Sequence, residues 1–80
     1  MANLQRAIEI AVEAHAEQSS RDGLPYVLHP LRMMLQMHTD AERIVAVLHD
    51  VVEDNPAWPL ARLADEGFAA EVLEAVDDLT

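Results

Sequence analysis

The feature of the sequence that most constrains its fold is an apolar stretch, residues 44–52, that runs into a cluster of ionisable side chains. Its apolar residues recur at the three- and four-residue spacing of one helix face. They are Ile44, Val45, Leu48, Val51 and Val52. Such a stripe predicts a helix that is buried against other elements. Thr39 or Asp40 is available to cap its start, and Asn55-Pro56 breaks it.

Helical spacing also marks the segments on either side. Asn3 is available as an N-cap, and Pro30 suits the first position of a helix because its missing N–H would be unpaired there. No segment shows the polar and apolar alternation of a strand. We therefore expect an all-α fold, a compact bundle of about five short helices that forms a single domain over residues 1–80. The expected helices are residues 3–18, 29–38, 40–54, 59–64 and 68–79.

The charge of the chain limits its partners. Acidic residues number 15 against 5 basic ones, which gives a net charge of −10. We therefore expect neither nucleic acid nor an anionic membrane as a partner, because both are bound by basic surfaces. A small phosphate-bearing substrate remains compatible with this charge, because a bound cation can supply positive charge locally.

Cysteine is absent, which excludes disulfides and thiolate metal sites. Residues 1–6 lack the basic-then-apolar pattern of a signal peptide. The apolar runs fall far short of the roughly 20 residues that span a bilayer. Cytoplasmic placement is therefore expected.

The ionisable cluster contains His49, Asp50, Glu53 and Asp54. On a helix, His49 shares a face with Glu53, and Asp50 shares one with Asp54. His29 precedes the cluster by one helix and a short turn, so two antiparallel helices would bring it close. Imidazole nitrogen and carboxylate oxygen are ligands that suit Mn, Fe, Co or Zn. Three protein ligands leave positions open for water and phosphate oxygens, as a catalytic metal site requires.

A second interpretation of the cluster needs no metal. A histidine near the C-terminal end of a helix interacts favourably with the helix dipole, so His49 would suit this position by itself. The three acids Asp50, Glu53 and Asp54 oppose the dipole and repel one another, which favours a compensating cation. The spacing alone leaves both interpretations open.

Two motifs resemble those of a known family. Residues 14–30 resemble its pattern A-H-x-x-Q, a turn of basic, small and Gly residues, and P-Y-[IV]-x-H-P, while residues 47–54 resemble L-H-D-[VT]-[VI]-E-D. Residues 66–68 and 76–80 are similar to its later F-G and V-D-x-[VL]-T elements. In this order and spacing, the motifs resemble HD-type metal-dependent phosphohydrolases, and most closely the hydrolase domain of the RelA/SpoT-type (p)ppGpp enzymes.

The resemblance implies a helical HD domain that holds one Mn ion or another divalent transition metal. His29, His49 and Asp50 match three of the family's metal ligands. Glu53 and Asp54 match the acidic pair that positions or deprotonates the attacking water. The implied reaction is hydrolysis of a nucleotide pyrophosphate, the removal of the 3′-pyrophosphate of (p)ppGpp by a metal-activated water.

The substrate side of the motif is carried by Arg21, which matches a basic position beside the nucleotide, and by Tyr26. The chain departs from the family at Ser20, where a second basic residue is usual, and at Asp22, which replaces a small residue. Both differences lower the local positive charge. The family's fourth ligand is an aspartate in a helix beyond the position of Thr80, so the domain is expected to be C-terminally incomplete.

Three hypotheses follow for the function of the chain. The first is a stand-alone, metal-dependent nucleotide pyrophosphohydrolase. The second is an inactive, truncated HD module that binds metal or nucleotide without turnover. The third is a fragment whose helices assemble with another chain. An apolar face left uncovered would then favour a homo-oligomer.

Overall fold

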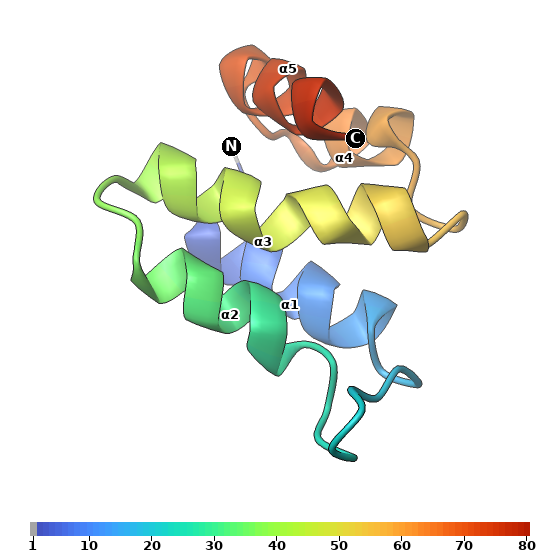
Figure 1. The fold of residues 1–80 in the computed structure, drawn as a ribbon. Coiled ribbons are helices and arrows are strands. Elements are labelled where there is room, and N and C mark those ends of the chain that lie inside the picture. The colour runs from blue at the N-terminus through green and yellow to red at the C-terminus, as the bar shows by residue number, and fades with distance from the viewer. Residues whose placement is uncertain (1) are drawn as a thin grey trace.

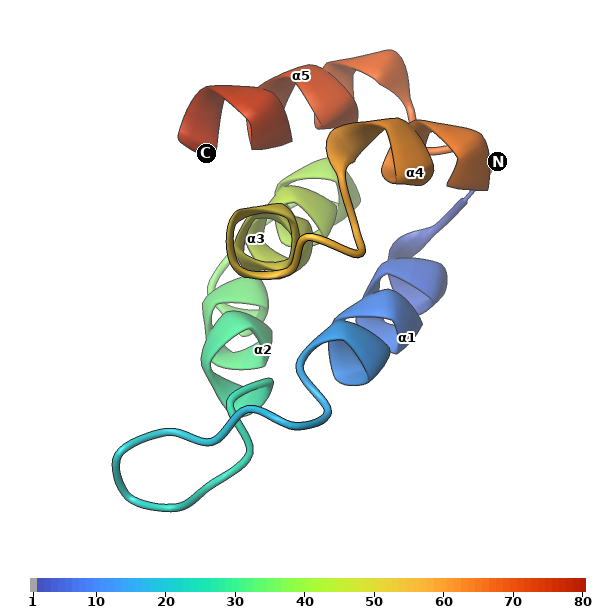
Figure 2. The same ribbon diagram turned by 90° about the vertical axis from the view of Figure 1, so that its right-hand side faces the viewer.

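Helix α3 (Asp40–Asp54) forms the centre of the fold, with helices packed on both sides of it (Figures 1 and 2). The computed structural model describes residues 2–80, which form helices and no strand, so the expected all-α fold is confirmed for this part of the chain. None of the helices is long and apolar enough to cross a lipid bilayer. The other helices are α1 (Leu4–Ala14), α2 (Leu28–Leu35), α4 (Leu60–Glu66) and α5 (Ala70–Leu79).

The start of α3 is fixed by a capping box. The Thr39 hydroxyl accepts a hydrogen bond from the Glu42 backbone N–H at 3.1 Å, and the Glu42 carboxylate accepts one from the Thr39 N–H at 3.1 Å. These bonds satisfy amide groups that a helix N-terminus leaves without partners. The hydrogen bond from the Thr39 hydroxyl lowers the pKa of Glu42, whose negative charge then suits the positive end of the helix dipole.

The apolar stripe predicted for α3 lies in the core. Ile44, Leu48 and Val51 are buried, while Val45 and Val52 are partly exposed at its margins. Helices α1, α2 and α5 pack against α3 and supply the facing side chains. The apolar residues buried with the stripe are Ala7, Ile10, Ala11, Met34, Val47, Trp58, Leu63, Phe68, Val72 and Val76. Removal of these side chains from water is the main favourable contribution to folding.

Helix α1 ends earlier than the sequence predicted, at Ala14 instead of residue 18. His15 is the C-cap residue, and its ring nitrogen Nδ1 forms a hydrogen bond with the side-chain oxygen of Gln18. The Gln18 N–H donates in turn to the His15 carbonyl at 3.0 Å. This local turn satisfies groups that a longer helix would have used, and it leads the chain into the loop before α2.

Two other helices are also shorter than predicted. Helix α2 ends at Leu35 instead of His38, and α5 begins at Ala70 instead of Phe68. Ala69, the N-cap residue of α5, is extended with φ −62° and ψ 146°. Phe68 is thereby buried in the core, and burial of this aromatic ring offsets the loss of two helical residues.

Polar contacts tie α1 to α4. The Arg6 guanidinium donates two hydrogen bonds of 2.8 Å to the two carboxylate oxygens of Glu66. Paired bonds of this kind fix the relative orientation of the two side chains. Next to this pair, the Ala2 N–H donates to the Gly67 carbonyl at 3.1 Å. Gly67 has φ 95°, the left-handed conformation that ends a helix and that glycine adopts without strain.

Candidate functional site

The beginning of α2 and the end of α3 lie side by side, because the two helices are antiparallel neighbours (Figure 1). This arrangement places His29 next to Asp50, with 3.9 Å between His29 Nε2 and Asp50 Oδ2. His49 approaches the other carboxylate oxygen, with 3.2 Å between its Nε2 and Asp50 Oδ1. Two of the three predicted metal ligands, His29 and His49, therefore flank the carboxylate of the third, Asp50.

The Asp50 side chain is buried, although it carries a carboxylate. A buried carboxylate is costly unless it has partners, and one partner here is the Tyr26 hydroxyl, which donates to Asp50 Oδ2 at 3.3 Å. Burial of the phenol and the negative charges of Asp50 and Asp54 raise the pKa of Tyr26 to about 12. The hydroxyl is therefore protonated at neutral pH and acts as a donor.

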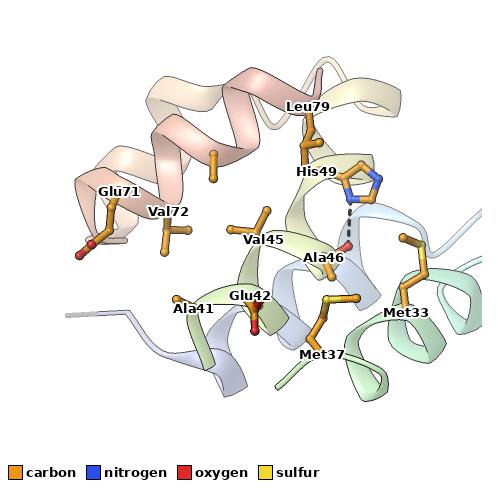
Figure 3. A pocket seen from close by; sticks show the side chains of 11 residues that line it. Met33, Met37, Ala41, Glu42, Val45, Ala46, His49, Glu71, Val72 and Leu79 are labelled. Carbon is orange, nitrogen blue, oxygen red and sulfur yellow. Dashed lines mark hydrogen bonds between the residues drawn. The ribbon is translucent and has the colours of Figure 1, made fainter. Parts of the chain in front are cut away.

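The orientation of His49 leaves one of its ring nitrogens facing Asp50. Its Nδ1 lies 3.0 Å from the Ala46 carbonyl oxygen, which can only accept a hydrogen bond (Figure 3). Nδ1 therefore carries a proton, and in the neutral ring Nε2 presents a lone pair. That lone pair meets the Asp50 carboxylate at 3.2 Å. Two electron-rich atoms at this distance need a proton or a metal cation between them.

A divalent cation fits the chemistry of these donors. Metal ligands about 2.1 Å from an ion lie roughly 3 Å from one another. The 3.2 Å separation of His49 and Asp50 agrees with this value, and the 3.9 Å separation of His29 and Asp50 is longer. Within residues 2–80, no group of three His, Asp or Glu side chains is already arranged to hold an ion. The His29 side chain is 59% exposed, and its Nε2 lies farther from the Asp50 carboxylate than the Nε2 of His49 does.

The predicted catalytic acids lie in the last turn of α3. Glu53 and Asp54 are both exposed to solvent, unlike Asp50. Asp54 follows Asp50 by one helical turn on the same face, and its charge contributes to the raised pKa of Tyr26. Within residues 2–80, Glu53 forms no ion pair. The structure thus places Asp54 near Tyr26 and Asp50, while both acids are exposed to solvent.

Tyr26 is held between two histidine rings. The centroid of its ring lies 4.9 Å from that of His15 and 5.9 Å from that of His29. His15 is almost fully buried, and its Nε2 has no hydrogen-bond partner among the described residues. The sequence predicts Tyr26 as a substrate residue, whereas the structure directs its hydroxyl toward Asp50.

A hollow of about 520 Å³ opens beside the cluster, between the loop that precedes α2 and α2 itself. The loop is closed by two backbone hydrogen bonds, from the Ser20 N–H to the Leu24 carbonyl at 2.8 Å and from the Tyr26 N–H to the Gln18 carbonyl at 3.0 Å. Gly23 has φ 82° in the turn between them. The hollow is lined by Ser19, Ser20, Arg21, Asp22, Tyr26, His29 and Arg32. Because Tyr26 and His29 belong to both the hollow and the cluster, a ligand in the hollow would reach the cluster.

The hollow contains the predicted Arg21 and also Arg32, which the sequence interpretation missed. The position of Arg32 beside His29 could have been predicted from the spacing of the two residues. Arg32 follows His29 by three residues, and residues three apart on a helix lie on the same face. Once His29 is assigned to the start of α2, the side chain of Arg32 is expected beside it.

A second hollow, of about 500 Å³, is almost entirely apolar and lies between α2, α3 and α5 (Figure 3). Its only charged or ionisable lining residues are Glu42, Glu71 and His49. The ring of His49 therefore borders both this apolar groove and the Asp50 cluster. The apolar lining consists of Met33, Met37, Ala41, Val45, Ala46, Val72, Ala75 and Leu79.

Several known proteins are similar in sequence to this chain over most of its length. Over 96% of the chain, it is 46% identical to guanosine-3′,5′-bis(diphosphate) 3′-pyrophosphohydrolase of Aquifex aeolicus and 41% identical to a probable GTP pyrophosphokinase of Mycobacterium leprae. Over 64% of the chain, it is 44% identical to the bifunctional (p)ppGpp synthase/hydrolase RelA of Mycobacterium tuberculosis. The chain is homologous to a segment of the RelA/SpoT-type (p)ppGpp enzymes.

These relatives are much longer than the chain. It spans about a tenth of their length, between 8% and 11% in the three cases. No family model matches it. The similarity therefore supports common ancestry with one segment of these enzymes, and it agrees with the resemblance carried by the motifs.

Proposed function

We propose that the chain is a metal-dependent nucleotide pyrophosphohydrolase that removes the 3′-pyrophosphate of guanosine-3′,5′-bis(diphosphate). The observation that carries this proposal is the approach of His29 and His49 to the buried carboxylate of Asp50, beside a hollow with two arginines. Relatives named for this hydrolase activity, with 33–46% identity to the chain, support it further.

In this proposal His29, His49 and Asp50 hold the metal, which we expect to be Mn²⁺ or another divalent transition ion. When bound, the ion supplies a water of lowered pKa and positive charge for the phosphate oxygens. The Ala46 carbonyl holds the proton of His49 on Nδ1, which leaves Nε2 free as a ligand. The Tyr26 hydroxyl orients the Asp50 carboxylate.

The remaining roles fall to exposed residues next to the cluster. Asp54 and Glu53 are proposed to orient the attacking water and to accept its proton. Their exposed positions in the last turn of α3 leave room for a water and a phosphate. Arg21 is proposed to bind the nucleotide's phosphates from the hollow, because a guanidinium donates paired hydrogen bonds to phosphate oxygens.

The experiment that tests this function measures metal content and pyrophosphate release together. The purified chain is loaded with Mn²⁺ and incubated with guanosine-3′,5′-bis(diphosphate), alongside His49→Ala and His38→Ala variants. His38 is an exposed histidine outside the cluster and serves as the matched control. We expect stoichiometric Mn²⁺ and pyrophosphate release in the wild type and in His38→Ala, and the loss of both in His49→Ala. Absence of metal and turnover in the wild type would overturn the proposal.

The second candidate is a module that binds metal or nucleotide without turnover. It is favoured by the incomplete closure of the ligand group, in which His29 lies 3.9 Å from Asp50. Stoichiometric Mn²⁺ without pyrophosphate release, in the same experiment, would support this candidate over the hydrolase.

We further propose that a second copy of the chain covers the apolar groove. Leu79 at the end of α5 is 59% exposed, and Met33 of α2 and Met37, which follows α2, lie on the opposite side of the groove (Figure 3). Methionine is adaptable and suits apolar contacts between copies. The acidic side chains Glu42 and Glu71 oppose this association at low ionic strength, since each copy has a net charge of −10.

A further inference from the structure

Only two of the five arginines lack an ion pair or another strong contact within residues 2–80. Arg6 binds Glu66, and Arg43 lies 3.3 Å from Asp40. Arg62 stacks on the ring of Trp58, with 3.6 Å to the centroid, and donates to the Ala57 carbonyl at 2.8 Å. The chain has no lysine, so these five side chains are its only permanent cations. The two arginines that remain are Arg21 and Arg32, and both line the polar hollow.

The acid next to the loop arginine, Asp22, also lines the hollow and keeps its negative charge there, but it forms no ion pair within 4.0 Å with either arginine of the hollow. Asp22 accepts a hydrogen bond from the Ser20 hydroxyl, and this bond is the main reason that the pKa of Asp22 is lowered. The charge of Arg32 makes a smaller contribution to the same shift, and the two side chains form no ion pair within 4.0 Å. Arg32 is therefore near Asp22 and still has its donors free.

The two arginines of the hollow lie on different elements of the structure. Arg21 belongs to the loop, while Arg32 is anchored on α2, one helical turn after His29. A ligand atom bound by Arg32 would therefore lie close to His29, because the two residues are three apart on the same face of α2. Ser19 adds a hydroxyl group to the wall of the hollow, while the Ser20 hydroxyl is already used as a donor to Asp22. Two guanidinium groups and a hydroxyl are the donor set that phosphate groups require.

We propose that Arg32 is a second phosphate-binding residue, which works with Arg21 to hold a pyrophosphate group in the hollow beside the Asp50 cluster. This inference rests on the proposed function, because it assumes that the phosphates belong to the nucleotide substrate. Arg32 binds the phosphate that is not attacked and sets its distance from the cluster. It therefore determines specificity for a substrate with two linked phosphates over one with a single phosphate.

The test uses inorganic pyrophosphate and inorganic phosphate as probes on the full chain, with and without Mn²⁺, by isothermal titration calorimetry. The variants are Arg32→Gln and Arg21→Gln, with Arg43→Gln as the control. Each removes one positive charge, so the change in net charge is the same in all three variants. Circular dichroism and thermal unfolding check that each variant is folded.

We expect Arg32→Gln and Arg21→Gln each to weaken pyrophosphate binding about tenfold, the effect of losing a charge-assisted hydrogen bond. Arg43→Gln is expected to change it less than about twofold. Phosphate binding is expected to fall less than pyrophosphate binding in Arg32→Gln. Asp22→Asn keeps an acceptor for Ser20 and removes a negative charge from the hollow, so it is expected to tighten pyrophosphate binding.

The outcomes separate this inference from the proposed function. Equal pyrophosphate affinity in Arg32→Gln and Arg43→Gln would overturn the inference, even if the wild type hydrolyses guanosine-3′,5′-bis(diphosphate). Selective loss of pyrophosphate binding in Arg32→Gln, from a wild type without turnover, would support the inference while the hydrolase function fails. In an active enzyme, Arg32→Gln is expected to raise KM about tenfold with little change in kcat, since the contact is the same in the ground and transition states.

Discussion

The hydroxyl group of Tyr26 donates a hydrogen bond of 3.3 Å to the buried carboxylate of Asp50, although the two residues are 24 positions apart in the sequence. The loop before α2 and the end of α3 are joined by this contact. It also fixes which oxygen of Asp50 faces His29, because His29 approaches the same Oδ2 atom at 3.9 Å. Tyr26 is therefore a positioning residue for Asp50 in the proposed metal site.

The first prediction concerns this contact. Tyr26→Phe keeps the ring that packs against His15 and removes only the hydroxyl. We expect Mn²⁺ affinity to fall about tenfold, the lower end of the effect of losing a partner that orients a metal ligand. Calorimetric titration with Mn²⁺ measures it, and circular dichroism monitors the fold. Unchanged Mn²⁺ affinity would show that the hydroxyl does not position Asp50.

The second prediction concerns the core. Leu48 is fully buried in the middle of α3, so Leu48→Ala leaves a cavity among the helices around it. We expect a loss of about 2–5 kcal/mol in the free energy of unfolding. Leu35→Ala is the matched control, because Leu35 is 74% exposed, and its effect is expected within about 0.5 kcal/mol. Urea unfolding followed by circular dichroism compares them, and similar losses in both variants would contradict the packing described for α3.

The third prediction concerns the pH dependence of stability. Hydrogen bonds from Arg6 lower the pKa of Glu66 below its value in the unfolded chain. A carboxyl group with a lowered pKa stabilises the fold above its unfolded pKa, and the stabilisation disappears as the pH falls through its folded pKa. We therefore expect Glu66→Gln to lower Tm at pH 7 and to have a smaller effect in acid.

Thermal unfolding across the acidic range measures this difference. Glu74→Gln serves as the control, because Glu74 is exposed and forms no ion pair within residues 2–80. Its effect on Tm is expected to be small at every pH. A Tm difference between wild type and Glu66→Gln that stays constant down to low pH would show that the Arg6 and Glu66 pair does not contribute through its charge.

The fourth prediction concerns self-association through the apolar groove. Salt screens the repulsion between copies of net charge −10, so the dimer fraction is expected to rise as NaCl is increased from about 0.01 M to about 1 M. Ala75→Glu places a charge in the groove and is expected to keep the chain monomeric, whereas Ala61→Glu, at an exposed position of α4, is not. Sedimentation velocity distinguishes these states. A wild type that is monomeric at every salt concentration would rule out the second copy as the occupant.

The amino-acid pattern was enough to predict the helices and to identify the residues of the candidate cluster. The periodicity from Ile44 to Val52 predicted α3, because helical spacing depends on residues close in the chain. The sequence offered Thr39 or Asp40 as its cap, and the structure has Thr39 in that position. The spacing of His29 and His49 was enough to expect antiparallel neighbours. The ends of two helices were predicted less well. Helix α1 ends at Ala14, where His15 forms a hydrogen bond with Gln18, and α5 begins only after Phe68, which is buried in the core.

The contacts between side chains of different elements follow from tertiary packing and could not be predicted from the sequence. That Tyr26 bonds to Asp50, that Arg32 shares a hollow with Arg21, and that His49 borders the apolar groove all depend on how α2, α3 and the loop pack together. Local spacing carries no information about such contacts, because they are set by the burial of apolar side chains distributed over the whole chain. The chemistry of the residues is thus readable from the sequence, and their distances and partners follow from packing.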